Sequence, residues 1–166
     1  MDQLWAPWRM AYVTAPKPPG DAEPCFICRG LDADDDRANL IALRTERSVV
    51  ILNRFPYNNG HLLIAPRSHK GRLDELDGAE MVDTQETLRR MVAALEGLMK
   101  PDGFNVGLNL GRAGGAGLPG HLHWHVVPRW YGDTNFMPVT GDTRVIVQSL
   151  DSLWELLTTA LREGRA

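Results

Sequence analysis

The 166-residue sequence has only two cysteines, no long apolar run and no excess of basic residues. No stretch approaches the ~18 apolar residues of a membrane span, so we expect no membrane-crossing segment. The N-terminus lacks the basic-then-apolar order of a secretory signal, and we therefore expect a cytoplasmic location. A formal net charge of −3 argues against a general nucleic-acid binder but leaves room for a small phosphorylated ligand.

The remaining composition is that of one soluble globular domain, with 43% hydrophobic and 23% charged residues and no internal repeats. We expect a single domain over residues 1–166, with an N-terminal extension (1–24), a core (25–130) and a C-terminal loop and helix (131–166). The aromatic stretch at 3–12 is predicted to pack on the domain or on a second subunit. Residues 15–24 carry four prolines and are predicted to be an irregular connection.

Three of the five histidines, His121, His123 and His125, occupy alternate positions of one segment. If the segment is a strand, all three imidazoles line one face at intervals of ~6.7 Å, and Pro128 ends the strand. Residues 111–120, which precede it, contain five glycines and can turn backbone N–H groups toward an anion. The pattern indicates phosphate chemistry, with either a metal cluster or an imidazole nucleophile as its basis.

Periodicity predicts an antiparallel α+β fold. Residues 48–53 and 61–65 have the composition of strands joined as a hairpin, and 104–110 form a further predicted strand. A capping box at 77–80 and apolar residues at helical spacing predict a long helix that Pro101 stops. Residues 150–161 predict an amphipathic C-terminal helix.

The two cysteines, Cys25 and Cys28, form a Cys-x-x-Cys pair, which is typical of metal or redox sites but also occurs in ordinary cores. No thioredoxin-like βαβ pattern surrounds the pair. A closed zinc site needs two further ligands. Spacing alone does not choose them from the five histidines: His61, His69, His121, His123 and His125.

The motif "HLHWHVVPR" after a glycine-rich loop, with "GHLLIAPRSH" about sixty residues earlier, resembles the histidine triad (HIT) superfamily of nucleotidyl hydrolases and transferases. The resemblance covers residues 25–130. The flanks "QLWAPWRMAY", "GFNVGLNLG" and "PRWYGDTNFMPV" are similar to the bacterial diadenosine tetraphosphate phosphorylases of this superfamily. The resemblance implies a HIT-like α+β fold, with an antiparallel sheet of about five strands, one long and one C-terminal helix, joined across a homodimer.

The resemblance also assigns catalytic and nucleotide-binding roles. His123 would be the nucleophile that attacks the α-phosphorus and forms a nucleotidyl-histidine intermediate, which water or inorganic phosphate then releases. His125 would line the phosphate site and orient the nucleophile through its carbonyl and ring, while His61 approaches the phosphate from the side. Asn53 would hold the ribose hydroxyls and Asn109 would lie beside the α-phosphate.

The resemblance further implies a structural zinc ion and no organic cofactor. In zinc-bearing members two cysteines, a histidine after the hairpin and the first triad histidine bind the metal. Here these residues are Cys25, Cys28, His69 and His121. A closed set of four such ligands is structural rather than catalytic.

One departure from the family pattern concerns the glycine-rich loop. Gly117 and Leu118 stand where dinucleoside polyphosphate hydrolases carry Gln and Ser or Thr, so contacts to the leaving group must come from backbone N–H groups or elsewhere. Gly115 and Gly117 are the expected nucleotide-binding positions. The departure favours phosphorolysis of a dinucleoside polyphosphate, although the phosphorylases carry Ser at the position of Gly117.

Three alternatives stay open at this stage. If it is not such a phosphorylase, the protein is a HIT hydrolase of nucleoside polyphosphates or phosphoramidates, a nucleotide-binding partner protein, or an enzyme whose catalytic metal is bound by the three alternating histidines.

Overall fold

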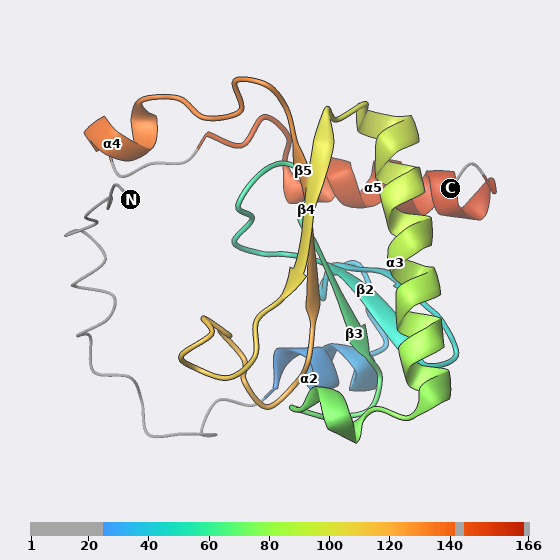
Figure 1. Ribbon diagram of the computed structural model, residues 1–166. Coiled ribbons are helices and arrows are strands. Elements are labelled where there is room, and N and C mark those ends of the chain that lie inside the picture. Colours follow the sequence, from blue (N-terminus) through green and yellow to red (C-terminus); the bar gives the residue numbers. More distant parts are fainter. Residues whose placement is uncertain (1–24, 142–144, 165–166) are drawn as a thin grey trace.

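A five-stranded antiparallel sheet forms the centre of the protein (Figure 1). The computed structural model describes residues 25–141 and 145–164, so the stretches predicted at 3–12 and 15–24 lie outside the described residues. The strands are β1 (Ile41–Arg44), β2 (Ser48–Leu52), β3 (Leu62–Pro66), β4 (Gly103–Leu108) and β5 (Trp124–Arg129), in the spatial order β1-β2-β3-β5-β4. The predicted antiparallel α+β fold of about five strands is confirmed.

The two predicted helices are also present. The long helix α3 (Gly78–Met99) starts at a capping box, in which Asp77 accepts from the Glu80 N–H at 2.8 Å and Glu80 accepts from the Asp77 N–H at 2.9 Å. The C-terminal helix is α5 (Leu150–Arg162). The short helices are α2 (Phe26–Asp32), η1 (Leu73–Glu75) and α4 (Met137–Gly141). No helix among the described residues is long and apolar enough to cross a membrane.

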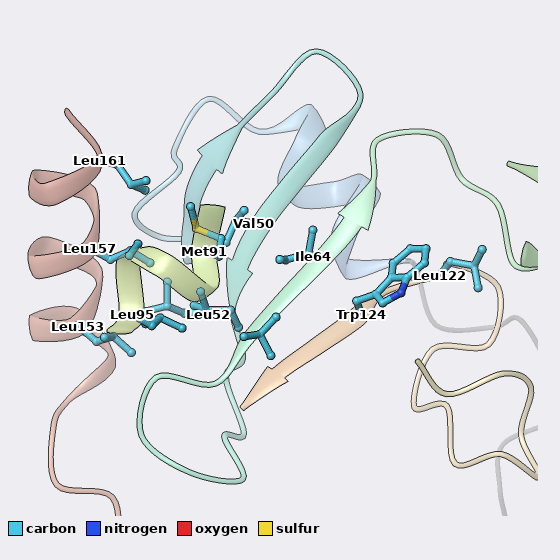
Figure 2. Close-up of a cluster of buried hydrophobic side chains, with 13 residues drawn as sticks. Val50, Leu52, Ile64, Met91, Leu95, Leu122, Trp124, Leu153, Leu157 and Leu161 are labelled. Carbon is cyan, nitrogen blue, oxygen red and sulfur yellow. The ribbon is translucent and has the colours of Figure 1, made fainter. Parts of the chain in front are cut away.

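The larger hydrophobic core lies between the sheet and helices α3 and α5 (Figures 1 and 2). Side chains alternate along each strand, so Val50 and Leu52 of β2 face α3 and α5, while Val49 and Ile51 face the opposite side. There they pack with Ile27 of α2 in a second, smaller cluster. Burial of each such side chain stabilises the folded state by roughly 1.5–3 kcal/mol. Helices thus pack on both faces of the sheet, α3 and α5 on one and α2 on the other.

The strand that was predicted to carry all three alternating histidines is shorter than expected. β5 begins at Trp124, so only His125 lies inside it, and His121 and His123 belong to the segment that leads into it. The alternation nevertheless continues, because Leu122, like Trp124, is buried in the larger core (Figure 2).

The prediction that Pro128 ends the strand is wrong. β5 continues to Arg129, and Pro128 is paired with Phe104 of β4. On the other side of β5, pairing with β3 stops at Val126, so no neighbouring strand there needs the N–H that proline lacks.

Candidate functional site

The ring of His123 is held by a backbone carbonyl. Its Nδ1 lies 2.8 Å from the carbonyl oxygen of His121, and because a carbonyl only accepts, Nδ1 carries the proton. The other nitrogen, Nε2, therefore keeps its lone pair. The residue is 6% exposed, and burial lowers its pKa, so the ring is neutral at neutral pH. The orienting carbonyl was expected from His125, and the structure corrects it to His121.

A chain of hydrogen bonds fixes the other two rings of the site. The backbone N–H of Tyr57 donates to Nδ1 of His61 at 3.0 Å, which leaves the proton of this ring on Nε2. That Nε2–H donates to Nδ1 of His125 at 2.9 Å. The proton of His125 is therefore on its Nε2. The tautomers of both rings follow from one main-chain donor.

His125 is an uncharged donor at neutral pH. Burial, assisted by the nearby His123, lowers its pKa to about 4. Its Nε2 lies 3.4 Å from the side-chain Nδ2 of Asn109. With a proton on Nε2, both nitrogens are donors that lie side by side, and a phosphate oxygen can accept from both.

The predicted ribose and phosphate positions lie around these rings. Asn53 ends the β2 side of the hairpin, and its Nδ2 lies 3.2 Å from Nδ1 of His61. Gly115 has a φ of +88°, and a side chain there would begin 4.0 Å from Nδ2 of Asn109. A side chain at Gly117 would meet nothing within 4 Å. The structure thus brings Asn53 and Asn109 to the histidines and Gly115 to the side chain of Asn109, whereas Gly117 faces open space.

Tyr57 is a contact residue that the sequence patterns did not single out. Its ring stacks on His125, with centroids 5.8 Å apart and planes at 16°, and it lies 4.6 Å from the ring of His61. The Pro-Tyr-Asn-Asn-Gly stretch predicted only a turn. The usable signal was an aromatic residue in that turn, four positions before His61.

The predicted metal ligands Cys25, Cys28, His69 and His121 also meet at one place. Each offers one ligand atom, and these four atoms all lie within 4.8 Å of one another. Nδ1 of His121 is 3.2 Å from Sγ of Cys25, and Nδ1 of His69 is 3.2 Å from Sγ of Cys28. Two thiols and two imidazoles form a closed donor set that can hold a metal ion.

The orientation of His121 fits metal binding. Its Nε2 lies 2.8 Å from the carbonyl oxygen of Pro66, so Nε2 carries the proton and Nδ1 presents a lone pair to the sulfur atoms. A backbone acceptor on the far nitrogen is typical of metal-bound histidines. Burial and the neighbouring Cys25 raise the pKa of the Cys28 thiol to about 11, so metal binding has to displace its proton.

A buried glutamate fastens the loop that carries His69. Glu80, at the start of α3, accepts from Lys70 at 2.7 Å and from Ser68 at 2.5 Å. These hydrogen bonds lower the pKa of its carboxyl to about 2, with Lys70 as the largest cause. The carbonyl of Lys70 in turn accepts from the N–H of Leu122 at 2.7 Å. The sequence predicted Glu80 only as part of a helix cap.

Comparisons with known proteins show which family the chain resembles. The model of the HIT domain matches residues 36–131. The AP-4-A phosphorylase of Mycobacterium tuberculosis is 36% identical over 163 residues, which cover 96% of this chain and 84% of that protein. The bis(5'-nucleosyl)-tetraphosphatase (asymmetrical) of Schizosaccharomyces pombe is 30% identical over 90 residues, or 54% of this chain and 49% of that protein.

The fold of the chain also matches that of a solved structure. The crystal structure of a Zn-bound histidine triad family protein from Mycobacterium smegmatis superposes with a TM-score of 0.62 at 25% identity, over 76% of this chain and 86% of that chain. The family match spans more than half of the sequence, and the mycobacterial phosphorylase matches nearly all of it. The chain therefore belongs to the HIT domain family.

Proposed function

We propose that this protein cleaves dinucleoside polyphosphates by nucleotidyl transfer through His123. The observation that carries the proposal is the fixed tautomer of its ring, in which Nδ1 donates to the His121 carbonyl and Nε2 keeps a lone pair. Because the ring is also neutral, Nε2 can attack phosphorus without first losing a proton.

In the first step a bond forms between Nε2 of His123 and the α-phosphorus, while the bond to the leaving polyphosphate breaks. The leaving group departs as an anion and needs no proton at neutral pH. The nucleotidyl ring still carries its Nδ1 proton and becomes cationic, so the His121 carbonyl at 2.8 Å stabilises it. In the second step the acceptor attacks phosphorus, and the P–N electron pair returns to Nε2.

The surrounding donors bind and orient the substrate. Nε2–H of His125 and Nδ2 of Asn109 donate to the α-phosphate, and His61 holds His125 in the donating tautomer. Asn53 binds the ribose hydroxyls beside His61. The backbone N–H of Gly117 contacts the polyphosphate, which the open space around Gly117 supports. The N–H of Gly115 donates to the Arg112 carbonyl at 3.0 Å, so Gly115 leaves room for the nucleotide and shapes the loop through its positive φ.

Inorganic phosphate is the proposed acceptor. The relative named a phosphorylase matches 96% of this chain, which supports phosphorolysis over hydrolysis. Hydrolysis is the second candidate, because a relative named a tetraphosphatase matches 54% of the chain. The phosphoramidate substrates considered from the sequence have no comparable support among these relatives.

The test incubates the protein with diadenosine tetraphosphate, with and without phosphate, and identifies the products. ADP and ATP that form only with phosphate would support phosphorolysis, while AMP and ATP without phosphate would indicate hydrolysis. Binding without turnover, and without a labelled enzyme intermediate, would contradict both and favour a nucleotide-binding partner protein. Full activity in the presence of a strong chelator would exclude the hypothesis of a catalytic metal bound by His121, His123 and His125.

We propose zinc as the metal held by Cys25, Cys28, His69 and His121. The Cys₂His₂ donor set and the zinc in the mycobacterial HIT structure support this choice. Bound zinc supplies a cross-link between three segments of the chain. The four residues hold the start of α2, the loop after β3 and the segment before β5 at one point.

A homodimer is proposed from the edge of the sheet. β4 has a neighbour only on its β5 side among the described residues, and Asn105, Val106 and Gly107 at its centre are exposed. An exposed edge strand of this kind can pair with a second copy across a two-fold axis. Analytical ultracentrifugation of the parent and of Val106→Pro tests the pairing; a parent that stays monomeric at micromolar concentration would contradict it.

A cytoplasmic location is proposed as well. Both cysteines are free thiols that lie against histidines rather than joined in a disulfide. A reducing compartment preserves such a metal-binding pair, whereas an oxidising one would convert it to a disulfide. Cell fractionation of the native protein tests this location.

A further inference from the structure

The hairpin loop between β2 and β3, residues 53–61, carries the groups that set the tautomer of His61. The Tyr57 N–H donates to Nδ1 of His61 at 3.0 Å, and Nδ2 of Asn53 lies 3.2 Å from the same nitrogen. Both groups belong to the loop, so the loop keeps the proton of His61 on Nε2, where it is donated to His125. The donating state of His125 therefore depends on what holds the loop.

Asn58 fastens this loop to the end of β5. Its Nδ2 donates to the carbonyl oxygen of Pro128 at 3.1 Å and to Oδ2 of Asp133 at 2.8 Å. Its own carbonyl accepts from the backbone N–H of His61 at 3.3 Å. Because Asn58 directly follows Tyr57, the hold on its side chain also fixes the position of the Tyr57 N–H relative to the His61 ring.

Asp133 is the fixed end of this link. Its side chain is 9% exposed, and it accepts from the Trp130 N–H at 3.2 Å and from the Arg129 guanidinium at 2.6 and 2.9 Å. The guanidinium holds the pKa of this carboxyl well below its usual range, so Asp133 stays a charged acceptor, and hydrogen bonds to charged acceptors are the strong ones. None of its hydrogen-bond donors among residues 25–141 and 145–164 is a histidine, so it acts on the site through another residue.

We propose that Asp133 is a positioning residue for nucleotidyl transfer, which through Asn58 holds the hairpin loop so that His125 presents its Nε2 proton to the α-phosphate. The inference rests on the proposed function and adds a residue to it. Without the link the Tyr57 N–H leaves His61, whose proton can then move to Nδ1. Nε2 of His61 becomes an acceptor, and the proton of His125 moves to Nδ1 to donate to it. Nε2 of His125 is then left with a lone pair that repels a phosphate oxygen.

The test is nitrogen-15 NMR of the histidine rings without substrate, which reports the nitrogen that carries the proton in each ring. The wild type should show His61 and His125 with the proton on Nε2. Asp133→Ala should move both rings toward the form with the proton on Nδ1. His123 should keep its proton on Nδ1, because the His121 carbonyl holds it, and so serves as a control within the same spectrum.

Asp102→Ala is the matched control variant. Asp102 is an aspartate at the same end of the sheet, and it accepts from the Tyr131 N–H of the same turn at 2.8 Å. Its removal should leave all three rings as in the wild type. Asn58→Ala breaks the link while Asp133 stays in place, so it tests the proposal even if Asp133→Ala does not fold. It should reproduce the shift of His61 and His125, and adding Asp133→Ala to it should cause no further shift.

Kinetics with diadenosine tetraphosphate connects the tautomers to the reaction. In Asp133→Ala kcat should fall in proportion to the loss of the Nε2–H form of His125, by at most about 10²–10³-fold for the complete loss of one donor. Wild-type tautomers in both Asp133→Ala and Asn58→Ala, a shift that includes His123, or a shift without a fall in kcat would overturn the positioning role. A wild type that turns over no substrate would contradict the proposed function, whereas unchanged tautomers contradict the role of Asp133, so the two failures are distinguishable.

Discussion

Replacing Asn109 by aspartate is expected to raise the pKa of His125. In the wild type burial and His123 lower the pKa of His125 to about 4, so the ring is neutral at pH 7. The new carboxylate would stand where Asn109 Nδ2 now lies, 3.4 Å from His125 Nε2. Two opposite charges ~4 Å apart attract by about 4 kcal/mol at an effective dielectric constant of 20, which corresponds to a pKa change of about three. With solvent screening, the pKa of His125 should rise to roughly 6.

The assay is a histidine-resolved NMR titration of the wild type and the variant. Asn105→Asp is the matched control, since Asn105 lies on the same strand and contacts Arg129 instead of a histidine. It should leave the His125 titration unchanged. A wild-type His125 that titrates near 6.5, or an Asn109→Asp ring that still titrates near 4, would refute the reasoning.

Stability gives a second readout with a definite sign. The folded pKa of His125, about 4, lies below the ordinary value near 6.5, so the unfolded chain binds the proton more tightly. Folding stability is therefore complete above pH ~6.5 and is lost as pH falls toward 4, by about 3 kcal/mol at most. In Asn109→Asp most of this decrease in folding stability at low pH should disappear. Urea unfolding of the wild type and the variant at pH ~6.5 and at pH ~4 measures the difference.

The nucleophile, the metal site and the core can each be perturbed separately. His123→Asn removes the attacking nitrogen and should lower kcat by at least ~10⁴-fold with little change in Tm; activity within tenfold of the parent would contradict the assignment. Cys28→Ser should abolish zinc retention by elemental analysis and lower Tm. Zinc uptake by the metal-free parent should release protons, because the pKa of this thiol is about 11. Leu157→Ala, at a fully buried position, should cost about 2–5 kcal/mol in urea unfolding, whereas Leu156→Ala, at 37% exposure, should cost less than about 1 kcal/mol.

Elements with strong periodicity were predictable from the sequence. α3 begins at its predicted capping box, and the hairpin of β2 and β3 pairs as the two apolar runs implied. β1 and α2 were not predicted, because four and seven residues are too few to show a period. α2 is held by tertiary contacts instead: Arg44 of β1 donates to the carbonyls of Gly30 and Leu31 at its C-terminal end.

The site was predictable in its residues but not in its hydrogen bonding. The family resemblance named the histidines and cysteines that the structure brings together, and their functional roles stay predictions. The carbonyl that orients His123 and the N–H that orients His61 could not be predicted. Nearly every residue has the same main-chain groups, so residue identity does not indicate which of them makes such a contact. Stacking of Tyr57 on His125 depends on two segments 68 positions apart, which local patterns do not relate.

Orientation by the main chain has an electrostatic consequence for substrate approach. Many hydrolases orient a catalytic histidine with a carboxylate, which adds a negative charge to the site. Here the Tyr57 N–H and the His121 carbonyl orient His61 and His123 without any formal charge. A polyphosphate arrives with several negative charges, and a like charge beside the nucleophile would repel it and slow association. Main-chain groups avoid that repulsion, and only a proline at position 57, which lacks the N–H, would remove one of them.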